Sequence, residues 1–368
     1  MSLRESPHAT AAAGFYARPE MAYAIVGQPV EGALGAFVAE LRLALEARGF
    51  SPAPGDEAAL VLNIVDRARP RPFRRRSRGT FVAALHELDA SPPDPLREGY
   101  PVLVRALANL SLAYVPGEGV WFTTLERGSY LVPTADEVAA RLEPLARSRL
   151  VIDNEFRPDL EPELWGGDAI TESIADAGRR LDTLGLLPAP FPVEDLVDAN
   201  DLRHIKRLYG IGGLSYGNLS ARKDETRFWM SASGVDKAKL EIPGRDILLV
   251  SGYDAEAARI VLSVPPGIEP RRVSVDAIEH WRIYQEHPDV DAILHVHAWL
   301  EGIPATEVNY PCGTEELAAN VAELLAAEPD PAHAVIGLRN HGITATGASL
   351  EEILDRVVPR LLAQVPMS

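Results

Sequence analysis

The segment VDAILHVHAW at residues 290–299 carries two histidines, His295 and His297, inside an otherwise apolar run. A short continuous apolar run is typical of a buried strand, and side chains two residues apart on a strand point to the same face. Two neighbouring imidazoles in a dry sheet need a shared partner, because burying unpaired polar rings costs free energy. A divalent metal ion is the natural partner. Zinc held by three protein nitrogens, with a fourth position open, would form a catalytic site.

A third ligand is needed, and six of the nine histidines lie between His280 and His341. His341 is the best candidate, because residues 334–347 are apolar and predict a second strand with His341 near its middle. We interpret His280, on the preceding helix, and His287, at its end, as structural. A pair of core histidines without a metal remains an equally good interpretation of the spacing alone.

The N-terminal half predicts a small α/β domain over residues 21–160, preceded by a polar, Ala-rich and disordered segment over residues 1–20. Apolar runs predict strands at 21–27, 59–66 and 80–88, and a hairpin at 117–133. Helical spacing predicts helices at 31–48, 100–114 and 134–149. Strands that alternate with helices indicate a small, largely parallel sheet.

An arginine-rich segment, RARPRPFRRRSR, follows the second of these strands at residues 67–78. It could bind an anion such as a phosphate or an acidic surface. A solvated loop is the favoured interpretation, because runs of charge are usually solvated and two prolines interrupt this one.

The C-terminal domain is expected over residues 161–368, after a stretch rich in proline, glycine and acids at 157–168. A helix is predicted to start at Asp168 or Thr171 and to run to residue 186. Further helices are predicted at 198–210, 275–287 and 350–365, and strands at 247–253 and 258–264. The loop GGLSYGNLSAR and the segment MSASGV expose backbone N–H groups and hydroxyls that suit a small anion or a sugar. A plain hairpin is the stronger interpretation of that loop taken alone.

Charge and composition exclude several classes of protein. The 368 residues include 53 acids and 36 basic residues, for a net charge of -17. We therefore expect no nucleic-acid partner and no anionic membrane surface as a partner. No apolar run reaches the roughly 18 residues of a membrane span, and the N-terminus lacks the apolar region of a signal peptide. A single cysteine, Cys312, fits a reducing cytoplasm.

The chain from about residue 171 to residue 364 resembles the class II aldolase/adducin family. Four segments match in order: ITESIADAGRRLDTLGL; GLSYGNLSAR with MSASGV; SVDAIEHWRIYQEHPDVDAILHVHAW; and YPCGTEELAANVAELL with VIGLRNHGITATG. The resemblance implies an α/β/α sandwich around a mixed, mostly antiparallel sheet. It also implies a homo-oligomer, a tetramer in the family's pattern, with active sites between subunits.

By this resemblance, His295, His297 and His341 bind Zn²⁺ or another divalent metal ion, and Asp276 is the catalytic acid/base in place of the family's usual glutamate. Asn218, Ser233, Gly234 and Ser274 correspond to substrate-binding positions for a phosphate. Val275 stands where a second serine is common, so whether the substrate is phosphorylated stays open.

The expected function is a zinc-dependent lyase that cleaves a C–C bond of a small hydroxy-carbonyl or sugar-phosphate-like compound. A pentulose-phosphate epimerase or a dehydratase of the same family would use the same residues. A non-catalytic, adducin-like assembly module is the alternative from another class. Three buried histidines argue against it, because a scaffold has no need of them.

Overall fold

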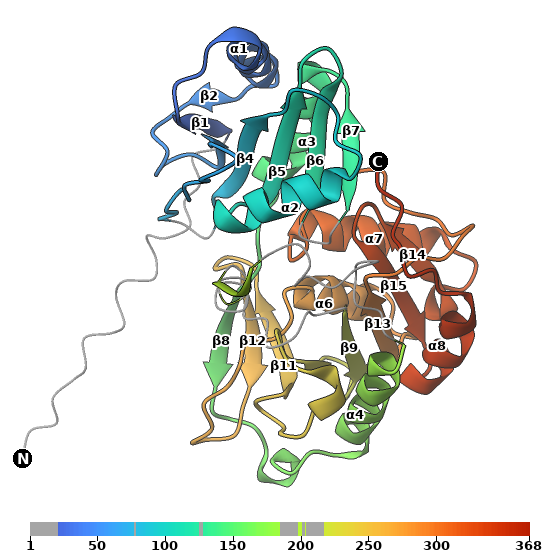
Figure 1. Cartoon of the computed structure of the whole chain (residues 1–368). Coiled ribbons are helices and arrows are strands. Elements are labelled where there is room, and N and C mark those ends of the chain that lie inside the picture. Colours follow the sequence, from blue (N-terminus) through green and yellow to red (C-terminus); the bar gives the residue numbers. More distant parts are fainter. Residues whose placement is uncertain (1–20, 77–78, 125–127, 185–197, 201–202, 204–216) are drawn as a thin grey trace, which may run out of the picture. The chain divides into compact units, whose positions relative to one another are not determined.

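The computed structural model describes residues 21–76, 79–124, 128–184, 198–200, 203 and 217–368. The described chain divides into two compact units, one ending at Arg147 and one beginning at Ser148. Each unit contains one sheet (Figure 1). The disordered segment expected at residues 1–20 and most of the helix expected at 198–210 lie outside the described residues.

The first unit is built on a seven-stranded sheet in the order β2-β1-β3-β4-β5-β6-β7. The strands are β1 (Ala22–Gly27), β2 (Ser51–Pro52), β3 (Leu60–Ile64), β4 (Phe81–Glu87), β5 (Leu110–Val115), β6 (Gly119–Thr124) and β7 (Ser129–Val132). Its helices are α1 (Gly32–Ala47), α2 (Pro95–Arg105) and α3 (Ala135–Arg147). Neighbouring strands from β2 to β5 are parallel, and β5, β6 and β7 are antiparallel. The expected α/β character of this half is confirmed.

The helix predicted at residues 100–114 is wrong in its bounds. Helix α2 begins earlier, at Pro95. The Asp94 side chain caps it by accepting a hydrogen bond from the Arg97 N–H. Residues 110–115 form β5, which pairs with β4 and β6. A short apolar run satisfies helical and strand patterns equally, and pairing with two neighbouring strands decides between them.

The arginine-rich segment is largely tied to its own unit. Arg67 pairs with Glu98 at 2.8 Å, Arg76 pairs with Asp56 at 2.6 Å, and Arg75 donates to the Leu107 carbonyl at 2.8 Å. Residues 77–78 lie outside the described part. These contacts fit the interpretation of a solvated surface loop.

The second unit is built on an eight-stranded sheet in the order β14-β15-β13-β9-β10-β11-β12-β8. The strands are β8 (Asp153–Arg157), β9 (Gly217–Arg222), β10 (Phe228–Ser231), β11 (Ile247–Asp254), β12 (Arg259–Ser263), β13 (Ala292–Val296), β14 (Val335–Leu338) and β15 (Gly342–Gly347). Every neighbouring pair is antiparallel except β12 with β8. The sheet is therefore mixed and mostly antiparallel, as expected.

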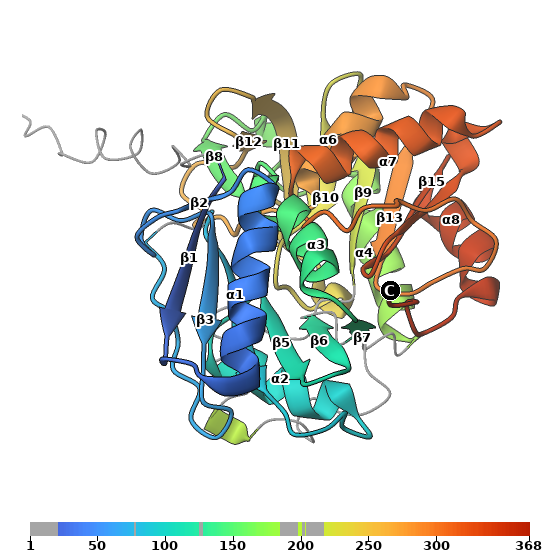
Figure 2. The same ribbon diagram turned by 90° about the horizontal axis from the view of Figure 1, so that it is seen from above.

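Helices cover both faces of this sheet (Figures 1 and 2). They are α4 (Ala169–Asp182), α6 (Ala277–Glu286), α7 (Glu315–Ala327) and α8 (Leu350–Val357). On one face α4 packs against α8 and β9, and on the other α6 packs against α7 and β11. Leu219, Leu294 and Ile343 are fully buried in the core of the sandwich. The α/β/α arrangement expected for this half is confirmed.

The prediction of one strand over residues 334–347 is wrong, because the segment is a hairpin of β14 and β15. Asn340 turns the chain with a φ of +59°, a left-handed conformation that asparagine tolerates better than most residues. His341 follows in the turn and donates its N–H to the Leu338 carbonyl at 3.0 Å. The consequence is that His341 stands at a strand end, where its ring can reach a neighbouring strand.

The boundary between domains was predicted at residue 160. Strand β8 pairs with β12 over five residues, so this strand is part of the second sheet. We propose that the second domain begins near Ser148, where the compact units divide.

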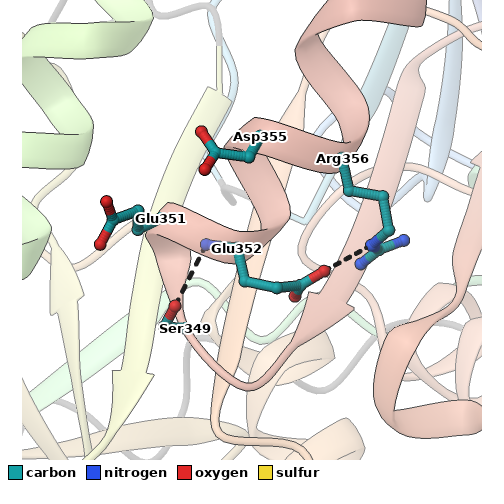
Figure 3. A pocket seen from close by; sticks show the side chains of 5 residues that line it. All are labelled: Ser349, Glu351, Glu352, Asp355 and Arg356. Atoms are coloured by element: carbon teal, nitrogen blue, oxygen red, sulfur yellow. Dashed lines mark hydrogen bonds and ion pairs between the residues drawn. The ribbon is translucent and has the colours of Figure 1, made fainter.

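One open hollow of about 570 Å³ lies on the surface of α8 (Figure 3). Its lining belongs to that helix and its cap: Ser349, Glu351, Glu352, Asp355 and Arg356. Glu352 pairs with Arg356 at 2.7 Å, and Ser349 caps the helix. Among the described residues, every helix is too short or too polar to span a lipid bilayer.

Gly217 is the residue that permits the close approach of β9 and β13. Its φ is +144°, and a Cβ there would lie 2.0 Å from the His295 carbonyl oxygen. We expect Gly217→Ala to lower the free energy of unfolding by about 2–4 kcal/mol, through backbone strain and overpacking. Urea denaturation measures this change in the free energy of unfolding. Gly252→Ala, where the added Cβ meets nothing closer than 3.4 Å, is the control. Equal stability of the two variants would contradict this account.

Candidate metal centre

The register of three strands places polar side chains on one face of the second sheet. His295 on β13 lies directly opposite Asn218 on β9 and opposite Thr344 on β15. These three side chains point toward helix α6, since Asn218 donates to Asp276 and Thr344 donates to Glu279. Side chains on a strand alternate between faces, so the apolar neighbours of these residues pack on the opposite side. The polar groups therefore meet under α6, at a single place.

His295 is held in one orientation by the backbone. Its Nδ1 lies 3.0 Å from the Ile343 carbonyl oxygen, and because a carbonyl only accepts, Nδ1 carries the proton. Its Nε2 then carries a lone pair, and among the described residues nothing hydrogen-bonds to it. Burial lowers the pKa of His295 well below its usual value, with the neighbouring His341 adding to the effect. A neutral imidazole with a fixed, unpartnered lone pair is the form that binds a metal ion.

His297 and His341 complete a group of three imidazoles. The Nε2 atoms of His341 and His297 lie 3.2 Å apart, and the His295 ring centroid is 4.8 Å from that of His341. One nitrogen from each ring lies within 4.8 Å of the other two. The structure thus brings together the three histidines predicted as ligands, and the donor set of one fixed lone pair and two adjoining Nε2 atoms fits a divalent ion such as zinc.

Asp276 stands beside this group at the start of α6. Its Oδ2 accepts a hydrogen bond from the Asn218 amide at 2.7 Å and lies 4.0 Å from His295 Nε2. The Ser274 hydroxyl lies 3.4 Å from the same oxygen and accepts from Asn218 at 3.0 Å. The other carboxylate oxygen, Oδ1, is buried and has no hydrogen-bond partner among the described residues. One oxygen is therefore fixed in position and the other remains available.

Ser233 and Gly234 lie on the segment that runs beside Ser274. Ala232 bridges Val273, and the Ser233 N–H donates to the Arg272 carbonyl at 2.8 Å. Gly234 adopts a φ of +65°, which turns the chain after the bridge. Of the substrate-binding candidates, Asn218 and Ser274 are hydrogen-bonded to each other. Ser233 and Gly234 lie just after the end of β10, on the segment that pairs with the one before Ser274.

A second acid, Glu279, is buried one helical turn beyond Asp276. Its Oε1 accepts a hydrogen bond from Thr344, and its Oε2 has no partner among the described residues. Burial raises the pKa of Glu279 to about 8, and the nearby Asp276 carboxylate adds to the rise. At neutral pH this side chain is mostly a neutral acid.

His280 has the structural role that its position on the helix suggested. Its Nδ1 lies 2.7 Å from the Ser220 hydroxyl, which also lies 2.8 Å from the Tyr284 hydroxyl. Burial lowers the pKa of His280 to about 4, so the ring stays neutral in this network.

Sequence reasoning missed Glu279 and the fully buried Ser220. The only signal was spacing: Glu279 is three residues after Asp276 on a helix, which places both on one face. A glutamate inside an amphipathic helix is normally exposed, so that spacing carried no weight.

The raised pKa of Glu279 predicts a pH-dependent stability. Between its ordinary pKa of 4.5 and the folded value of about 8, the folded state holds a proton that the unfolded state releases. Stability therefore falls as pH rises through this window, by on the order of a few kcal/mol. Glu279→Gln keeps the neutral form at every pH, so this part of the decline should disappear in its denaturation curves.

Glu286→Gln, a change at the exposed end of the same helix, is the matched control. This control variant should lose stability with rising pH as the wild type does. A Glu279→Gln variant that loses stability with pH as steeply as the wild type would contradict the assignment.

The chain was compared with known protein families and proteins. Residues 202–303, which belong to the second unit, match the family described as Class II Aldolase and Adducin N-terminal domain. A methylthioribulose-1-phosphate dehydratase of Klebsiella pneumoniae is 26% identical over 167 residues, covering 37% of this chain and 76% of the relative. A decarboxylase, tropJ, of Talaromyces stipitatus is 24% identical over 212 residues, covering 47% of this chain and 73% of the relative. The solved L-fuculose-1-phosphate aldolase of Thermus thermophilus is 23% identical, covers 50% of this chain and 84% of its own, and superposes with a TM-score of 0.31.

Proposed function

We propose that this protein is a metal-dependent lyase acting on a small hydroxy-carbonyl compound, and the match of residues 202–303 to the family described as Class II Aldolase and Adducin N-terminal domain supports the proposal. The observation that carries the proposal is the convergence of three imidazoles with a buried carboxylate, in which the His295 Nε2 lone pair has no hydrogen-bond partner among the described residues. A scaffold gains nothing from such a group, since unpaired buried polar atoms lower stability.

His295, His297 and His341 would hold the metal ion, and zinc suits three neutral nitrogens. A divalent ion there supplies a Lewis acid that polarises a carbonyl oxygen and a neighbouring hydroxyl of the substrate. The Ile343 carbonyl, by fixing the proton on His295 Nδ1, keeps the ligand nitrogen directed at that position.

Asp276 is the proton carrier in this proposal. Asn218 holds its Oδ2 in place, and the buried Oδ1 is the atom that would take a proton from the substrate carbon or hydroxyl and return it. Its burial keeps competing water away from the proton in transit. Ser233, Gly234, Ser274 and Asn218 would bind the remote end of the substrate through hydroxyl, backbone and amide donors.

A dehydratase is the second candidate, because relatives of this chain are named methylthioribulose-1-phosphate dehydratase. Dehydration and aldol cleavage both begin with removal of a proton near a polarised carbonyl, so the same residues serve either reaction. Assaying the purified protein for loss of water and for C–C cleavage, on methylthioribulose 1-phosphate and on L-fuculose 1-phosphate, separates the two.

His295→Ala is expected to lower metal affinity by at least about tenfold while the fold persists, because it removes one of three ligands together with the hydrogen bond to the Ile343 carbonyl that orients it. Elemental analysis of the purified variant measures the metal content. His333→Ala is the control, because His333 is an exposed histidine that pairs with Asp330. Full metal occupancy in His295→Ala would sink the ligand assignment.

Asp276→Asn should reduce turnover by about 10²–10⁴-fold and leave the metal content unchanged, because three neutral imidazoles hold the ion without the carboxylate. The amide keeps the size of the side chain, and no capping hydrogen bond is lost, because the Asp276 side chain makes none to the first turn of α6. Turnover at the wild-type rate would contradict the role of Asp276 as the proton carrier.

We also propose a homo-oligomer, a tetramer in the pattern of the family. Light scattering at micromolar concentration should give a mass several times the 39.9 kDa of one chain. A mass equal to one chain would contradict it.

A further inference from the structure

Residues 361–368 run beside both of the segments that carry the outer two histidines. Trp299, two residues after His297, forms an antiparallel bridge with Leu362. The Trp299 N–H donates to the Leu362 carbonyl at 2.9 Å, and the Leu362 N–H donates to the Trp299 carbonyl at 2.8 Å. One end of residues 361–368 is therefore fixed to the chain just after His297.

The other end is fixed by the side chain of Asn340, the residue before His341. Asn340 Nδ2 donates to the main-chain oxygen of Ser368 at 3.0 Å, and Asn340 Oδ1 accepts from the Ser368 N–H at 2.9 Å. The neighbouring Arg339 donates from Nη2 to Ser368 Oγ at 3.0 Å. Both ends of a buried amide are thus engaged by one residue, and we call these two hydrogen bonds the Asn340 clamp.

The indole of Trp299 makes a second connection between the same two segments. A Cβ added at Gly337 would meet the Trp299 ring, because the ring lies directly against the backbone of β14. Strand β14 leads into the turn that carries His341. Two routes therefore join the segment after His297 to this turn: the Trp299 indole on β14, and residues 361–368.

The ring of His341 is not oriented in the way that the ring of His295 is. His295 is held by the Ile343 carbonyl. Within the described part of the chain, the hydrogen bond that the structure gives to the His341 ring joins its Nε2 to His297 Nε2 at 3.2 Å. A shared metal ion needs a lone pair from each of these atoms, so neither could keep the proton between them. The position of His341 then depends on the turn that carries it.

We propose that Asn340 is a positioning residue of the metal centre. Its clamp on Ser368 fixes the turn that carries His341, and residues 361–368 tie this turn to the segment after His297. The inference rests on the proposed function for the presence of a metal ion. It adds that the spacing of two ligands depends on a segment that contributes no ligand itself. Such support is effective because a metal site must be held to within about 0.5 Å.

A purely structural role for Asn340 is the competing explanation. Asn340 adopts a φ of +59°, and its clamp would then serve only to anchor residues 361–368. Its loss would lower the stability of the fold but leave the two imidazoles of His297 and His341 in place. A positioning role predicts instead that the spacing of these rings and the affinity for a metal ion both change.

Asn340→Gly is the test variant, because glycine adopts the left-handed conformation freely and only the clamp is lost. Asn320→Gly is the matched control: the same exchange at a partly buried position of α7 weakens that helix and leaves the clamp intact. Each full-length protein is titrated with Co²⁺, and visible absorption reports the coordination geometry. We expect the wild type and Asn320→Gly to give the same affinity and spectrum. Asn340→Gly should bind Co²⁺ about tenfold more weakly, with a shifted spectrum.

Crystal structures of the wild type and of Asn340→Gly, both without metal, are the second measurement. The distance of 3.2 Å between His297 Nε2 and His341 Nε2 should change by more than about 0.5 Å in the variant. An unchanged distance, an unchanged Co²⁺ affinity, or an equal loss of affinity in Asn320→Gly would overturn the inference and leave the metal site in place. A wild-type protein that binds no Co²⁺ would overturn the proposed function, and this inference with it.

Discussion

The antiparallel register of β9, β13 and β15 is the constraint on which the rest of the site depends. It sets Asn218, His295 and Thr344 in one row across the sheet, under helix α6. A shift of one residue in any strand would turn its polar side chain into the apolar core on the other face. Because both faces of the sheet are buried, such a shift would greatly lower the stability of the fold. The register, and with it the positions of the site's side chains, is therefore fixed.

The second constraint is the burial of charge. Asp276 and Glu279 are each no more than 5% exposed, in a domain whose acids and bases otherwise lie mainly at the surface. Asp276 is stabilised by the hydrogen bond from the Asn218 amide, and Glu279 is stabilised by holding a proton. Such groups lower the stability of the fold, and proteins tolerate that loss mainly at functional sites.

The sequence predicted the architecture well where long periodic segments decide it. The sandwich, its mostly antiparallel sheet and the meeting of His295, His297 and His341 all follow from strand and helix patterns and from the family resemblance. Short segments were harder. The run at 110–115 fits either periodicity, and Asn340 turned one expected strand into two because a single left-handed residue is enough to reverse a chain. The burial of Glu279 depends on how α6 packs against the sheet, and no local sequence pattern contains that information.

The central claim is that three histidines bind one metal ion beside Asp276. An anomalous difference map from crystals of protein purified without chelators tests it most directly, with data collected on both sides of the zinc absorption edge. The account predicts a single strong peak at about 2.0–2.1 Å from one nitrogen each of His295, His297 and His341. A map with no peak there after the crystals are soaked in zinc, or a peak held by other residues, would contradict it.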